Sequence, residues 1–110
     1  DVTGFGLAGH LAGTCDASGV GATLRLADVP LMQGALDLAT AGIRSSLYPD
    51  NRNDNRITAP DTPLSALMFD PQTCGGLLAA LPKPLADKIA TDQNICIIGE
   101  ITKGSGVTIS

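Results

Sequence analysis

The chain has 110 residues, of which 44% are hydrophobic and 16% charged, and its formal net charge is −4. This length fits one domain with one hydrophobic core, which must be aliphatic because the chain has no Trp, one Tyr and two Phe. The acidic balance and the scattered basic residues argue against a nucleic-acid partner, and no apolar run reaches the roughly 20 residues of a membrane span.

Three cysteines lie far apart and form no CxxC pair. An odd number without a leader-like segment suits a reducing compartment, so we expect a cytoplasmic protein. Cys15 and Cys96 lie in apolar patterns and are expected in the core, whereas the glycines after Cys74 could expose its thiol. The chain begins at Asp1 with neither an initiator Met nor a polar lead-in, and we expect it to be one domain of a longer protein.

The first two elements have the clearest patterns. Apolar residues at four-residue spacing predict a helix over residues 4–18, which Thr3 caps and Gly19 ends. The glycines that weaken this helix, and that suggest close approach to another backbone, are Gly4, Gly6, Gly9 and Gly13. Residues 20–27 then alternate between apolar and polar, which predicts a strand.

The middle of the chain is predicted to contain one helix and one long loop. Asp28-Val29-Pro30 opens the helix and Gly42 ends it. Its buried stripe is expected to consist of Leu31, Ala35, Leu38 and Ala39. The polar stretch 45–63 is expected to be a loop, ordered at its start and flexible near its middle. The apolar segment 64–69 is compatible with a helix or a strand.

The last third is predicted to combine strands and tight turns. In chain order we expect a turn, a buried strand, a helix and the two strands of a hairpin, at residues 70–76, 77–81, 84–92, 95–102 and 107–110. The prediction for the whole chain is one α+β layered domain over residues 1–110, with a mixed, mostly antiparallel sheet packed against helices.

The first candidate for chemistry is the turn before the first helix. Backbone N–H groups that the glycines leave uncovered could bind a phosphate there, at Thr3, Gly4 and Gly6. The carboxylate of Asp1 could hold a Mg²⁺ that bridges phosphate oxygens. The alternative is a capping segment whose glycines serve packing.

The second candidate is the turn Asp70-Pro71-Gln72-Thr73-Cys74-Gly75-Gly76. It offers side-chain hydrogen bonds and, at its glycines, close approach to another surface. The alternative is an ordinary turn that leads into a strand. His10, the only histidine, fits a hydrogen-bonded surface or interface group better than a catalyst, and Cys74 has no evident base to activate it.

Three stretches of the chain together resemble signatures of the selenophosphate synthetases (selenide, water dikinases). They are DVTGFGLAGHL, AGIRSSLYPDNR and FDPQTCGGLL, at residues 1–11, 41–52 and 69–78. They come in the family's order with about its separation, and the IIGEIT segment near the end is also similar. The resemblance covers essentially the whole chain and implies the C-terminal α+β domain. The same superfamily includes aminoimidazole ribonucleotide synthetase, thiamine-monophosphate kinase and a hydrogenase-maturation protein.

The resemblance implies an enzyme that converts ATP, selenide and water into selenophosphate, AMP and phosphate for selenocysteine and selenouridine synthesis. Its cofactors would be Mg²⁺ and a monovalent cation such as K⁺. It also implies an N-terminal domain that holds ATP, forms a homodimer and carries the nucleophilic Cys or selenocysteine and the catalytic Lys. The 110-residue chain alone is therefore expected to be inactive.

Residue by residue, the resemblance assigns one metal ligand. Asp1 matches the Asp that opens the DVTGFG motif and binds Mg²⁺ in the family, with its partner aspartates in the N-terminal domain. Family members commonly have Ser at the position of Cys74, so a hydroxyl hydrogen bond is not carried over. Two other interpretations stay open: the C-terminal domain of a related ATP-dependent synthetase or kinase, and a non-enzymatic binding or assembly module.

Overall fold

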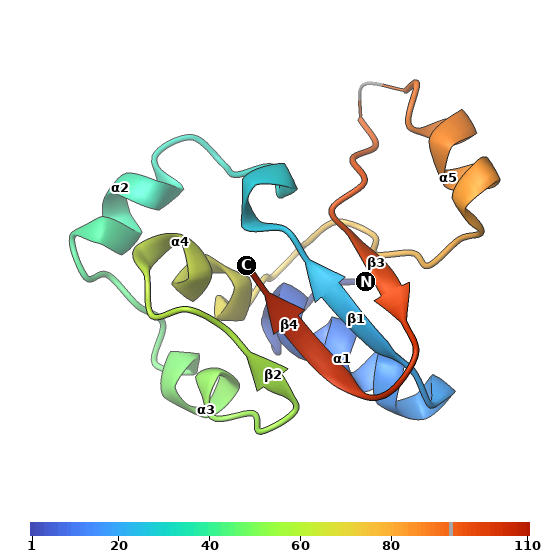
Figure 1. Ribbon diagram of the computed structural model, residues 1–110. Coiled ribbons are helices and arrows are strands. Elements are labelled where there is room, and N and C mark those ends of the chain that lie inside the picture. The colour runs from blue at the N-terminus through green and yellow to red at the C-terminus, as the bar shows by residue number, and fades with distance from the viewer. Residues whose placement is uncertain (93) are drawn as a thin grey trace.

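A four-stranded sheet forms the framework (Figure 1), and helix α1 (Gly6–Ser18) packs on one side of it. The computed structural model describes residues 1–92 and 94–110. The strands are β1 (Gly21–Leu24), β2 (Ile57–Thr58), β3 (Gly99–Thr102) and β4 (Gly106–Ile109). The helices are α1 (Gly6–Ser18), α2 (Ala35–Thr40), α3 (Tyr48–Arg52), α4 (Pro63–Ala66) and α5 (Lys83–Ile89), with 3-10 turns η1 (Leu26–Asp28) and η2 (Leu67–Phe69). The α+β class is confirmed.

The sheet has the strand order β2-β4-β1-β3. Strand β1 pairs in parallel with β4 and antiparallel with β3, and β2 pairs in parallel with β4. The sheet is therefore mixed, as predicted, but the prediction that it is mostly antiparallel was wrong. The predicted hairpin was also wrong, because β1 lies between β3 and β4 and pairs with both.

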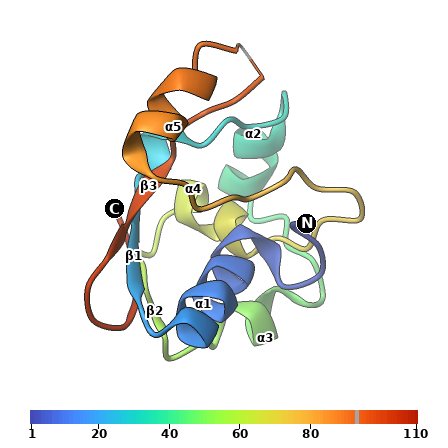
Figure 2. The same ribbon diagram turned by 90° about the vertical axis from the view of Figure 1, so that its right-hand side faces the viewer.

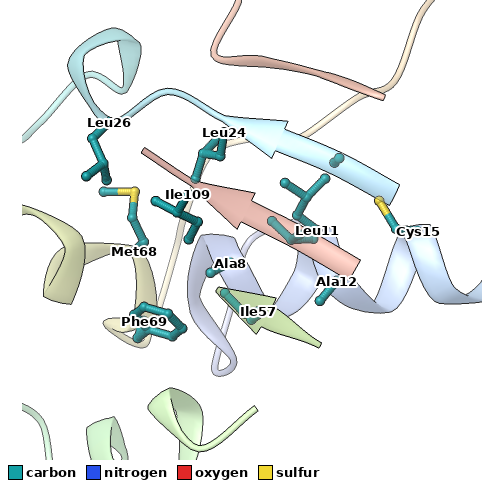
Figure 3. Close-up of a cluster of buried hydrophobic side chains, with 12 residues drawn as sticks. Ala8, Leu11, Ala12, Cys15, Leu24, Leu26, Ile57, Met68, Phe69 and Ile109 are labelled. Carbon is teal, nitrogen blue, oxygen red and sulfur yellow. The ribbon is translucent and has the colours of Figure 1, made fainter. Parts of the chain in front are cut away.

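The core lies between α1 and the sheet. Helix α1 packs against β1, β2, β4 and η2, and Figure 2 shows it beside one face of the strands. Phe69 and Met68, both buried in η2, extend this core toward α3 and α4 (Figure 3). Burying a side chain of this size contributes about 1.5–3 kcal/mol. The segment that leads into the 70–76 turn is thus firmly anchored.

Helix α1 begins later than predicted and without the predicted cap. Its N-cap is Phe5, which makes no side-chain capping bond. Thr3 does not cap the helix, because its hydroxyl lies 3.0 Å from Nε2 of His10. The predicted end is confirmed: Gly19 has a φ of 66°, the left-handed conformation that glycine adopts without strain.

The second predicted helix is shorter and less buried than expected. Pro30 lies outside it, and α2 follows Gly34, whose φ of 83° interrupts any helix from further upstream. Of the predicted stripe only Ala39 is buried, and 58% of Leu38 is exposed. Helix α2 packs against α4 and η2, but most large apolar side chains of residues 31–39 remain exposed.

Three further predictions in the second half need correction. The 45–63 stretch is not simply a loop, since it contains α3 and β2. Residues 77–81 form no strand, and 87% of Leu77 is exposed. Cys96 is exposed and not in the core, and the predicted strand 95–102 forms only at its end, as β3. By contrast, α5 and the core position of Cys15 agree with the sequence.

An ion pair fixes the start of β2. Two guanidinium nitrogens of Arg56 bind the Asp54 carboxylate at 2.9 and 2.7 Å, and the Arg56 carbonyl accepts the Val107 N–H of β4 at 2.8 Å. The hydrogen bonds from Arg56 lower the pKa of Asp54. The pair therefore stabilises the attachment of β2 to the sheet.

We expect Asp54→Asn to lower the free energy of unfolding by about 0.5–1 kcal/mol near pH 7. Because the folded pKa lies below the unfolded value of about 3.9, the carboxylate contributes fully above that value and loses its contribution as pH falls through the folded pKa. Urea unfolding at a series of pH values should show wild type and variant converging in acid. A difference that stays constant down to about pH 2 would contradict this assignment.

Candidate functional site

The two glycine-rich turns that the sequence singles out lie against each other. Residues 1–5 form an arm before α1, and this arm runs along the 70–76 turn. The Val2 N–H donates to the Gly76 carbonyl at 3.0 Å, and the Gln72 N–H donates to the Thr3 carbonyl at 3.0 Å. Val2 is buried in this contact. The motifs are about 70 residues apart in sequence and form one structural unit.

Glycine is required at two positions of this contact. A Cβ at Gly75 would overlap the Val2 carbonyl oxygen. Gly6 has a φ of 74°, and a Cβ there would lie 2.9 Å from the Met68 carbonyl oxygen. Both glycines therefore serve close backbone approach, as the sequence suggested for the glycines of each turn. A Cβ at Gly76 would meet open space.

Asn51 in α3 joins the two turns through its side chain. Its Nδ2 donates to the Gly4 carbonyl at 2.8 Å and to the Phe69 carbonyl at 3.0 Å. Sequence reasoning did not select this residue. The signal available was its place in the stretch 41–52, the third of the family-like stretches, which the structure thereby brings to the same site.

His10 holds the arm from the side of α1. Its Nε2 lies 3.0 Å from the Thr3 hydroxyl, and its ring meets the Phe5 ring edge to face at 5.5 Å between centroids. The Thr3 carbonyl accepts the Gly6 N–H as well as that of Gln72. His10 is thus a hydrogen-bonded group near the surface, in agreement with the sequence. Its hydrogen bond restrains the Thr3 side chain.

An open groove runs beside this unit, between α1 and the segment that contains α3. Its volume is about 910 Å³. The lining residues are Phe5, Gly9, His10, Gly13, Thr14, Asp50, Asn51, Asn53, Asp54, Asn55 and Arg56. Most of them are polar, so the groove suits a polar ligand or a hydrated surface better than an apolar one.

The described part of the chain offers one candidate metal ligand at the arm and no complete metal site. The carboxylate of Asp1 belongs to an exposed residue. Within residues 1–92 and 94–110, no group of three or more His, Cys, Asp or Glu side chains could hold a metal ion. Because Mg²⁺ takes six oxygen ligands, Asp1 fits as one member of a shell that other groups must complete.

Of the three cysteines, only Cys15 is buried. Burial raises the pKa of the Cys15 thiol, which keeps it protonated and unreactive. Cys74 and Cys96 are exposed, and all three cysteines are free. Among the helices described, none combines the length and apolarity needed to cross a membrane.

Comparison with known proteins identifies the class to which this fold and site belong. A family model described as "AIR synthase related protein, C-terminal domain" matches residues 1–110, and the chain belongs to this family. The family expected from the sequence motifs is thereby confirmed at the level of the domain.

Similar curated proteins are named "Selenide, water dikinase". One from Nitratidesulfovibrio vulgaris (strain Hildenborough) is 39% identical over 97% of this chain and 34% of the relative. One from Trichlorobacter lovleyi is 46% identical over 74% of this chain and 25% of the relative. One from Paraburkholderia xenovorans is 34% identical over 96% of this chain and 33% of the relative. The chain thus spans about a third of the length of these relatives.

Proposed function

We propose that the protein is a selenide, water dikinase and that residues 1–110 are its C-terminal domain. The reaction would convert ATP, selenide and water into selenophosphate, AMP and phosphate for selenocysteine and selenouridine synthesis. The observation that carries this proposal is the meeting of three separated stretches at one site. The arm, the 70–76 turn and Asn51 are joined by four hydrogen bonds of 2.8–3.0 Å, and each belongs to a stretch that resembles a signature of that family.

Asp1 would supply one oxygen ligand to Mg²⁺ on the ATP phosphates. Phosphoryl transfer asks a protein mainly for positioning and for neutralisation of charge, which the metal ion supplies when bound. Thr3, Gly4 and Gly6 would form the phosphate side of the same turn. Within this turn Gly6 would contribute by close packing and not by its N–H, because that N–H already donates to the Thr3 carbonyl. A monovalent cation such as K⁺ would be a further cofactor of the full-length protein.

The remaining aspartates, the nucleophile and the catalytic Lys would come from an N-terminal domain that binds ATP and forms a homodimer in the cytoplasm. Two apolar surface stretches support burial of this domain against a further part of the polypeptide. Their exposed residues are Leu31, Met32, Leu36, Leu38, Ile43 and Leu47 in the first, and Leu77, Leu81, Leu85, Ile95, Ile97 and Ile101 in the second. The net charge of −4 supports the absence of a nucleic-acid partner.

A second candidate is another ATP-dependent synthetase or kinase of the same superfamily. The matching family description also covers this candidate, because "AIR synthase related protein" is broader than the dikinases. The two candidates differ in whether ATP cleavage depends on selenide.

We expect the full-length protein to form AMP and selenophosphate from ATP only when Mg²⁺ and selenide are both present, as followed by ³¹P NMR. The 110-residue chain alone should form neither, because one carboxylate holds Mg²⁺ poorly in water. Cleavage of ATP to ADP by the full-length protein without selenide would favour the second candidate. Formation of AMP by the isolated chain would contradict the division of roles between the domains.

A further inference from the structure

Asn51 is held rigidly at the junction of the two turns. Its helix, α3, is anchored on the buried ring of Phe69 from both ends. The Tyr48 ring meets Phe69 edge to face at 6.5 Å, and the Arg52 guanidinium lies 4.9 Å above the Phe69 ring. Arg52 also donates to the Ala59 carbonyl at 3.1 Å. The side chain between these anchors therefore has a defined position.

The amide of Asn51 matches its two acceptors in number and kind. One NH₂ group carries two hydrogens, and the structure gives it two backbone carbonyls, those of Gly4 and Phe69. Gly4 lies within the arm, two residues beyond Val2, and Phe69 lies directly before the 70–76 turn. The backbone pairs between arm and turn hold residues 2 and 3. Asn51 adds a third point of attachment at residue 4, where the arm turns into α1.

Without this attachment the arm would be held at Val2 and Thr3, by the 70–76 turn and by His10, but not at Gly4. At Gly4 an added Cβ would meet nothing within 4 Å, so side-chain packing does not restrain the chain there. The two hydrogen bonds of Asn51 replace that packing. They constrain the direction in which the arm leaves α1. They thereby also constrain the position of the Asp1 carboxylate, three residues before Gly4.

We propose that Asn51 is a positioning residue that fixes the Asp1 carboxylate by clamping the arm to the segment before the 70–76 turn. This inference deepens the proposed function and rests on it, since a fixed Asp1 matters for a Mg²⁺ shell completed by another domain. Small errors in the position of a charged ligand are costly in phosphoryl transfer, where positioning and charge neutralisation supply most of the catalysis.

The test compares variants of the full-length protein. Asn51→Ala removes the amide, and Asn51→Leu removes it while keeping nearly the same volume. Asn94→Ala is the matched control, because Asn94 is exposed, lies outside the groove, and its side chain makes no hydrogen bond within the described residues. Hydrogen–deuterium exchange is measured on peptides that cover residues 1–6 and 70–76. The Mg²⁺ concentration for half-maximal selenophosphate formation is measured on the same samples.

We expect both Asn51 variants to exchange roughly tenfold faster in these two segments, as the loss of about two hydrogen bonds implies. We also expect their half-maximal Mg²⁺ concentration to rise on the order of tenfold, with β1 protected as in wild type and Asn94→Ala unchanged. Unchanged exchange would overturn the clamp, and faster exchange with an unchanged Mg²⁺ requirement would overturn the positioning role. A wild-type protein without selenide-dependent ATP cleavage would overturn the proposed function instead, and the exchange data would still decide whether Asn51 holds the arm.

Discussion

Replacing Asp1 by Asn in the full-length protein should lower the rate of selenophosphate formation by about 10²–10³. That loss is typical of the removal of one electrostatic contact to a transition state. Asn keeps the size and the hydrogen bonding of Asp but lacks the negative charge that a hard cation prefers. The variant should also need more Mg²⁺, because a neutral amide oxygen is the weaker ligand. Initial rates over a series of Mg²⁺ concentrations measure both effects.

The stability of the variant should hardly change, since Asp1 is exposed and makes no ion pair within the described residues. Asp61→Asn is the matched control, because Asp61 is also exposed and lies outside the site. It should leave both the rate and the melting temperature as in wild type. Near-wild-type turnover of Asp1→Asn at every Mg²⁺ concentration, with the protein folded, would remove Asp1 from the site. The arm would then be a purely structural element.

The elements that the sequence predicts well are those that local interactions determine. Helix α1 combines a four-residue apolar spacing with Gly19, which directly follows its last residue, Ser18, and ends the helix by its left-handed conformation. Strand β1 covers only Gly21–Leu24 of the predicted residues 20–27, but its even positions Ala22 and Leu24 are buried as the pattern requires. Such signals lie within a few residues of the structure that they specify.

The failures concern interactions between distant segments. Strand β2 has two residues, and only its pairing with β4 makes it a strand. The chain reverses between β3 and β4 as in a hairpin, yet both strands pair with β1, which lies about 80 residues earlier. Residues 77–81 are as apolar as a strand requires but have no strand partner here. Composition and periodicity do not specify partners.

The site was predicted in its parts but not in its assembly. The glycines that follow Thr3 and Cys74 indicated close backbone approach, and Gly6 and Gly75 show it. The pairing of the arm with the 70–76 turn depends on backbone hydrogen bonds, which leave no trace in side-chain identity. Asn51 was missed for a related reason, since an Asn in a polar stretch is ordinary until its acceptors are known.

The contact between Gly75 and Val2 should be the least tolerant point of the site. We expect Gly75→Ala to lower the free energy of unfolding by about 1–3 kcal/mol, the usual cost of overpacking. The new methyl group would overlap the Val2 carbonyl oxygen and lie 3.1 Å from the Cβ of Gln72. Because the first obstacle is backbone, a side-chain rotation cannot relieve it. Relief requires that the turn move away from the arm, which breaks the bond between Val2 and Gly76. Denaturant unfolding of the 110-residue chain measures the loss.

Gly76→Ala is the control for that experiment, since the same methyl group one residue later meets nothing within 4 Å. Neither glycine has a positive φ, so the backbone accepts alanine at both positions. We expect Gly76→Ala to be neutral or to stabilise by up to about 1 kcal/mol, because alanine restricts the unfolded chain. In the full-length protein, Gly75→Ala should also raise the Mg²⁺ requirement, whereas Gly76→Ala should not. Equal stability of the two variants would show that the arm and the turn are not packed as the structure has them. A destabilised Gly75→Ala with normal Mg²⁺ dependence would separate this contact from the position of Asp1.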